Sequence, residues 1–331
     1  PGVAPDPTTA PSRLAKFHRM LSARSIDTAA LRELSWSGIP RHFRLHTWQL
    51  LLNYLPSNSD RHAAALERKR AEYQQCVARY FETAGAARTD QEQAILRQVL
   101  VDVPRTNPTV PLFHTKFVQQ SLERVLFVWA VRHPASGYVQ GMNDLVTPFY
   151  AVFLEPYASL DSTSVDADEA TLLAVEADVY GCLTRLLDGI QDHYTPSQPG
   201  LQRMMFRMRE LVLRVDEELG THLEDQDLRF EQFTFRWFNC LLLRELPMKL
   251  SLRLWDTCLC EGGGFDSFIV YIGAALLLRF SKELKEMRAL EFIGFLQELP
   301  TGEWSTDAVE ELLSQAFVYK TAFHAAPSHL Q

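Results

Sequence analysis

The chain has 331 residues, of which 33 are basic and 41 acidic, so its formal net charge is −8. A negative balance argues against non-specific binding to nucleic acid, whose phosphates attract basic surfaces. Apolar residues make up 47% and charged residues 22%, as in ordinary soluble globular proteins, and this length allows a large buried core.

The cysteines and the apolar runs indicate the cellular compartment of the protein. The five cysteines form no even set and no Cys-x-x-Cys pair. Four of them lie in apolar helical contexts, which favours reduced core thiols and a cytosolic protein. The longest apolar run, Ile269 to Leu278, is too short to span a bilayer. No secretory signal is evident, and the proline-rich segment 1–12 is expected to be disordered.

Helical periodicity dominates the first part of the chain. Pro40 is placed to open one helix and Pro148 to kink another, whereas the acidic segment 155–169 reads as an exposed insertion. The apolar spacing predicts helices over 13–34, 41–54, 60–81, 92–101, 112–132, 140–154 and 171–187.

A Pro/Gly/Ser-rich turn, Thr195 to Gly200, is the clearest internal boundary. No strand-like alternation and no repeat period occur on either side of it, so we predict an all-α fold in two helical lobes. Beyond the turn, helices are predicted over 201–219, 231–244, 247–260, 265–280, 288–299 and 305–325, with Gly262-Gly-Gly264 as a turn.

Two polar side chains stand in segments that restrict the backbone. Arg105 lies between Pro104 and Pro108, with Asp102 placed to accept from its guanidinium or from loop N–H groups. Gln140 follows Ser136, a candidate N-cap, so a helix from there would put Asn143 and Asp144 on the same face as Gln140. An arginine that offsets negative charge and an amide that orients a water can together assist phosphoryl transfer.

These two segments carry a family resemblance. They are similar to the two finger motifs of the TBC-domain family, the GTPase-activating proteins for Rab GTPases, and two further blocks resemble that family's opening and C-terminal signatures. The four blocks are Val99-x-x-Asp102-x-x-Arg105, Tyr138-x-Gln140-Gly141, Gly38-Ile-Pro40-x-x-x-Arg44-x-x-x-Trp48, and Arg253-Leu-Trp255-Asp256 after Phe235-Arg-Trp237 and Glu245-Leu-Pro247.

The resemblance implies a single TBC domain over 30–325, with a catalytic lobe over about 30–195 and a second lobe over about 200–325. It implies an activator of a Rab-type GTPase in its GTP-bound form, with Arg105 and Gln140 catalytic in trans. Supporting roles would fall to Asp102, Tyr138, Gly141, Asn143, Asp144, Arg44 and Trp48.

On the same resemblance the chain would need no cofactor or metal of its own, since the GTPase carries GTP and Mg²⁺. It would regulate vesicle traffic from the cytoplasm, with peripheral recruitment to membranes as a possibility, and the short apolar run predicts no transmembrane segment. The details most resemble the Golgi-associated subgroup.

The sequence also allows other interpretations. The chain could be a TBC-like scaffold without hydrolysis, and Arg105 could be a surface residue or an ion-pair partner of Asp102. The three glycines lack the Lys-Ser/Thr of a phosphate-binding loop. His42 and His46 have metal-pair spacing but no third ligand, so surface imidazoles are expected, and solvation is expected for Asp192-His193.

Overall fold

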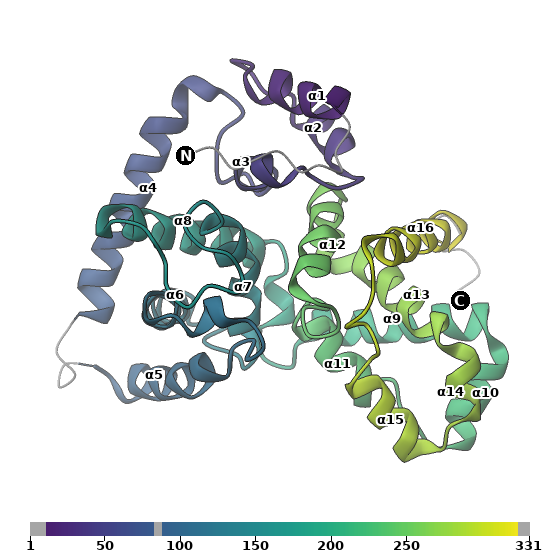
Figure 1. Cartoon of the computed structure of the whole chain (residues 1–331). Coiled ribbons are helices and arrows are strands. Elements are labelled where there is room, and N and C mark those ends of the chain that lie inside the picture. The colour runs from purple at the N-terminus through teal and green to yellow at the C-terminus, as the bar shows by residue number, and fades with distance from the viewer. Residues whose placement is uncertain (1–10, 83–87, 324–331) are drawn as a thin grey trace. The chain divides into compact units, whose positions relative to one another are not determined.

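The computed structural model describes residues 11–82 and 88–323 and is helical along this length, as predicted (Figure 1). No strand is assigned within these ranges, where the only extended pairing is an isolated bridge between Ser25 and Asn58. The chain separates into two compact units between Pro196 and Ser197, inside the turn-rich segment. None of the helices in the described ranges is both long and apolar enough to cross a membrane.

The first unit is organised around a buried helix, α7. All twelve of its residues from Met142 to Phe153 are buried, including Pro148, and it packs against α3, α6 and α8. Among its described residues the α-helices are α1 (Pro11–Leu21), α2 (Thr28–Ser35), α3 (Arg41–Leu51), α4 (His62–Cys76), α5 (Asp90–Asp102), α6 (Lys116–Arg132), α7 (Met142–Phe153) and α8 (Glu169–Asp188).

Two buried carboxylates of α8 attach it to its neighbours. Glu176 accepts two hydrogen bonds from Arg124 of α6, at 2.8 and 2.6 Å, and one from the Tyr73 hydroxyl of α4. Two residues on, Asp178 is held in the same way by Arg70. Each carboxylate is thus both neutralised and hydrogen-bonded, the condition under which a buried charge is tolerated. These contacts fix α4, α6 and α8 around α7.

The second unit packs around α13, the apolar run seen in the sequence, which contacts α9, α11 and α16. Arg253 of α12 donates to both carboxylate oxygens of Glu310 in α16, at 2.6 and 2.8 Å, and so joins two helices far apart in the chain. The helices are α9 (Pro199–Val215), α10 (Glu217–Asp225), α11 (Glu231–Asn239), α12 (Met248–Cys260), α13 (Ile269–Arg279), α14 (Ser281–Glu286), α15 (Ala289–Gln297) and α16 (Thr306–Phe323).

Side-chain caps divide two helices that were predicted to be continuous. The expected helix 13–34 is α1 and α2, because Asp27 accepts from the backbone N–H groups of Ala29 and Ala30 and starts a new helix. The expected helix 201–219 is likewise divided at Asp216, which caps α10 through the N–H of Leu219 at 3.0 Å.

The predicted disordered segment 1–12 is wrong at its end, since Pro11 and Ser12 belong to α1; residues 1–10 lie outside the described ranges. The short helix α14 was not predicted. Of the five cysteines, the four in apolar contexts are buried free thiols, as expected.

Candidate functional site

Arg105 ends a short 3₁₀ turn, Val103–Arg105, that continues directly from α5. Val103 is buried while Pro104 and Arg105 are exposed, so the turn directs the arginine outward. The turn closes through the N–H of Thr106, which donates to the Val103 carbonyl at 3.1 Å. Asn107 then reverses the chain with a φ of 41°, a left-handed conformation that asparagine tolerates better than most residues.

The ion pair between Asp102 and Arg105, left open by the sequence, does not form. The Asp102 carboxylate instead accepts a hydrogen bond from the Tyr138 hydroxyl at 2.8 Å. Within residues 11–82 and 88–323 no carboxylate pairs with Arg105. Its guanidinium is therefore available to a group outside the chain.

The predicted helix start at Ser136 is wrong. Helix α7 begins at Met142, and the residue before it, Gly141, has a φ of 100° that stops a helix from extending backward. Gln140 is exposed in the turn ahead of the helix, whereas Asn143 and Asp144 are buried in its first turn. They consequently do not share a helix face with Gln140. Gly141 is required here because an L-residue would be strained at this φ.

A buried hydrogen-bond network joins the two segments. Tyr138 donates to Asp102 and lies 3.5 Å from the Asn143 side-chain oxygen. Asn143 donates from Nδ2 to the Thr106 hydroxyl at 3.0 Å, and that hydroxyl donates to the Asp102 carbonyl at 3.2 Å. All four residues are buried, and Thr106 is completely inaccessible. The turn bearing Arg105 and the turn bearing Gln140 are therefore held together at their bases.

Thr106 is the residue of this network that the sequence analysis missed. It follows Arg105 directly, and a threonine there is unremarkable in sequence because its hydroxyl could equally have faced solvent. The available signal was the tendency of Ser and Thr hydroxyls to bond a carbonyl three or four residues earlier, as Thr106 does to Asp102.

Three further residues with expected supporting roles, Arg44 and Trp48 of α3 and Asp144 of α7, differ from one another in burial and contacts. Trp48 is fully buried, and its ring meets Phe149 of α7 edge-on with centroids 5.9 Å apart. Its contribution here is core packing that fixes α3 against α7. Arg44 is half-buried and donates to the Ile39 carbonyl at 3.3 Å. Asp144 is buried, and its backbone carbonyl accepts from the Thr147 hydroxyl at 2.7 Å.

The remaining candidates give no second site. His46 is half-buried rather than a surface imidazole; burial lowers its pKa, and the neighbouring His62 ring lowers it further. His193 is also buried, so its predicted solvation is wrong. Across the described ranges no cluster of three or more His, Cys, Asp or Glu side chains could hold a metal ion.

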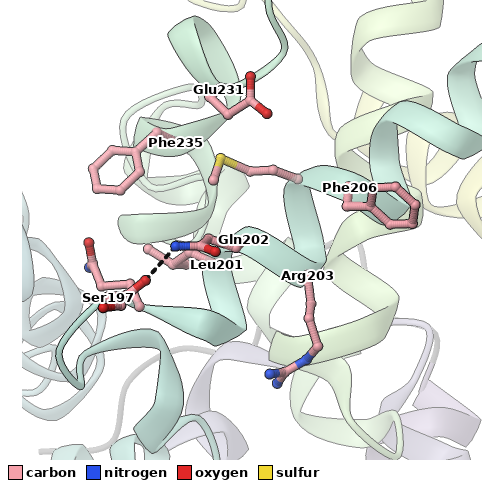
Figure 2. A pocket seen from close by; sticks show the side chains of 9 residues that line it. Ser197, Leu201, Gln202, Arg203, Phe206, Glu231 and Phe235 are labelled. Carbon is pink, nitrogen blue, oxygen red and sulfur yellow. Dashed lines mark hydrogen bonds between the residues drawn. The ribbon is translucent and has the colours of Figure 1, made fainter.

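A depression of about 650 Å³ lies on the second unit, between α9 and α11 (Figure 2). Phe206 and Phe235 line it together with Arg203 and Gln202, and the Gln202 amide donates to the Ser197 carbonyl at 2.6 Å. It is open to solvent and shows no grouping of titratable side chains suited to catalysis. The paired turns of Arg105 and Gln140 are therefore the strongest candidate site.

Comparison with known proteins defines the class. The Rab-GTPase-TBC domain family, RabGAP-TBC, matches residues 41–285, so the chain belongs to this family. The crystal structure of the Ypt/Rab-GAP domain of Gyp1p superposes with a TM-score of 0.89 at 40% identity, covering 94% of this chain and 98% of that one.

Two curated relatives show the same similarity. The GTPase-activating protein gyp1 of Schizosaccharomyces pombe is 47% identical over 97% of this chain and 63% of its own length. The human TBC1 domain family member 22B is 43% identical over 99% of this chain and 65% of its own length. The chain thus spans somewhat less than two thirds of each of these relatives.

Proposed function

We propose that this chain accelerates GTP hydrolysis by a Rab-type GTPase in its GTP-bound form, supplying catalytic side chains in trans. Membership of the RabGAP-TBC family and the names of its relatives support the general role. The observation that carries the proposal is the pairing of exposed Arg105 and exposed Gln140 on two turns whose bases are bound together by buried hydrogen bonds.

Each side chain has a distinct task in this proposal. Arg105 enters the nucleotide site and stabilises the negative charge that develops on the leaving oxygen and the γ-phosphoryl group. A guanidinium suits this because its planar fork donates several hydrogen bonds to phosphate oxygens at once. An arginine supplied in trans raises the rate of hydrolysis by roughly 10³–10⁵.

Gln140 orients the attacking water, the task that the GTPase's own glutamine performs in Ras-type catalysis. An amide suits this role because its oxygen accepts from the water while its NH₂ group donates to the phosphate. The partner holds GTP and Mg²⁺, so the chain acts as an activator and binds no cofactor of its own. The cytoplasmic and Golgi-associated location stays a prediction.

Single-turnover GTP hydrolysis with a panel of purified Rab GTPases tests the proposal. The wild-type chain should stimulate at least one of them, and Arg105→Ala should remove most of that stimulation without lowering the melting temperature, because Arg105 is exposed. Arg19→Ala, which changes an exposed arginine of α1, is the matched control and should retain activity. Undiminished stimulation by Arg105→Ala would refute the role of Arg105, whereas a wild-type chain that stimulates no Rab GTPase would favour the scaffold.

A further inference from the structure

We propose that Thr106 is a positioning residue that holds Arg105 and Gln140 in one fixed arrangement. The inference rests on the function proposed above and extends it to a residue that touches neither the nucleotide nor the GTPase. Thr106 is completely buried, next in sequence to Arg105, and bonded to the segment that follows Gln140.

The Thr106 hydroxyl is used as both donor and acceptor. Its proton goes to the Asp102 carbonyl, 3.2 Å away, and its oxygen accepts from Asn143 Nδ2 at 3.0 Å. The backbone N–H of Thr106 donates to the Val103 carbonyl at 3.1 Å. Two of these bonds close the turn that carries Arg105, and the third ties that turn to α7.

The bond from Asn143 to Thr106 matters because it is a second attachment between the turn of Arg105 and the segment of Gln140. The hydrogen bond from Tyr138 to Asp102 joins the two segments on the N-terminal side of Arg105 and Gln140. The bond from Asn143 to Thr106 joins them on the C-terminal side. One attachment would leave a pivot, whereas two separate attachments fix both the spacing and the orientation of the turns.

Such fixing has a catalytic consequence. Groups that act together on a transferring phosphoryl must be held within about 0.5 Å and 10–20° of their productive geometry. A displacement of about 1 Å can lower the rate about a hundredfold. The backbone of that turn sets the point from which the exposed Arg105 side chain reaches the GTPase. Loss of the Thr106 hydroxyl should therefore lower kcat while the docking surface stays intact.

Thr106→Val is the direct test, because valine has nearly the shape of threonine and carries a methyl group in place of the hydroxyl. We expect kcat for stimulated hydrolysis to fall about tenfold or more, with KM changed less than about twofold. Thr106→Ser keeps the hydroxyl and should restore most of the rate. Thr109→Val is the matched control: Thr109 lies in the same loop but is exposed, and its hydroxyl donates to the Asn107 side-chain oxygen at 3.3 Å.

A second readout separates positioning from general weakening of the fold. In the Arg105→Ala background, Thr106→Val should cause much less than its tenfold loss, because part of what it positions is already gone. A merely structural threonine would give the same fractional loss in both backgrounds, together with a lower folded fraction. If Thr106→Val does not fold, Asn143→Ala removes the same bond from the other side, together with the contact to Tyr138, and should show at least as large a loss of kcat.

The outcomes distinguish the two proposals. If Arg105→Ala and Gln140→Ala lose activity but folded Thr106→Val matches the wild type, Thr106 is not a positioning residue and the proposed function stands. Equal losses for Thr106→Ser and Thr106→Val would also overturn the role of the hydroxyl. If the wild-type chain stimulates no Rab GTPase, the proposed function fails, and the role of Thr106 fails with it.

Discussion

The turn between α12 and α13 contains three consecutive glycines whose replacement by alanine should have three different effects. A Cβ on Gly262 would meet nothing within 4 Å, and this residue is exposed. Gly263 has a φ of 70°, and its Cβ would lie 3.0 Å from the Ser267 hydroxyl oxygen. Gly264 is buried, and a Cβ there would lie 1.8 Å from the Cys258 carbonyl oxygen, which is backbone and cannot rotate away.

The expected change in the free energy of unfolding follows from the surroundings of each glycine. Gly262→Ala should be neutral or should stabilise by about 0.4–1 kcal/mol, because alanine restricts the unfolded chain. Gly263→Ala should cost about 1–2 kcal/mol, the strain of an L-residue in the left-handed region. Gly264→Ala should cost about 3 kcal/mol or more, the upper end for overpacking, because the C-terminal end of α12 must shift.

Urea denaturation of the full chain, followed by far-ultraviolet circular dichroism, measures the series. Each variant adds one methyl group at one of three consecutive positions. Gly262→Ala therefore serves as the control for the other two. Because the chain has two compact units, the transition assigned to the second unit is the one to compare. Equal midpoints for Gly262→Ala and Gly264→Ala would refute the close approach of this turn to Cys258.

Three further predictions concern the first unit. Arg105→Lys should recover little of the activity lost in Arg105→Ala, because an ammonium cannot reproduce the planar fork; single-turnover rates that approach the wild type would contradict this. Glu176→Ala should lower the free energy of unfolding by about 3–5 kcal/mol, since it leaves the Arg124 charge half-buried and unpaired. The matched change Glu72→Ala, in an exposed pair, should cost at most about 1 kcal/mol, so similar urea midpoints for the two variants would refute the estimate. Burial lowers the pKa of His46 in the folded state, so the unfolded state binds more protons as the pH falls below the ordinary value of 6.5. The free energy of unfolding should therefore fall between pH 7.5 and 5.5 more steeply in the wild type than in His46→Leu; parallel slopes would show that His46 is not responsible.

The sequence was sufficient for the fold class because helical periodicity is a property of local apolar spacing. It was less reliable wherever a single polar side chain or a glycine ends a helix. Asp27 and Asp216 interrupt patterns that look continuous, since capping depends on which side-chain rotamer reaches the backbone. Gly141 has a comparable effect, because its positive φ makes α7 begin at Met142, after Gln140. In the sequence Ser136 was an equally plausible N-cap, which would have started the helix before Gln140.

The candidate site was predictable as a set of residues but not as a geometry. Arg105 and Gln140 were identified from the chemistry of their side chains and from the family motifs. That Asp102 pairs with Tyr138 rather than with Arg105 depends on a contact across 36 positions, which no local pattern encodes. Burial of His193 and of Thr106 is equally non-local, so neither could be read from sequence.

The central claim is that Gln140 replaces the GTPase's own glutamine, and a double-mutant cycle tests it most directly. The kcat/KM for stimulated hydrolysis is measured for wild-type and Gln140→Ala chains, each with a wild-type Rab and with a Rab whose switch glutamine is changed to alanine. Gln120→Ala, an exposed glutamine of α6, controls for the substitution itself. Alanine is used in the Rab because a larger side chain could obstruct docking.

Substantial stimulation of the mutant Rab, together with a large loss in Gln140→Ala on either Rab, is the predicted result. Loss of stimulation with the mutant Rab, combined with near-normal rates for Gln140→Ala on the wild-type Rab, would contradict the account and make Gln140 a structural residue.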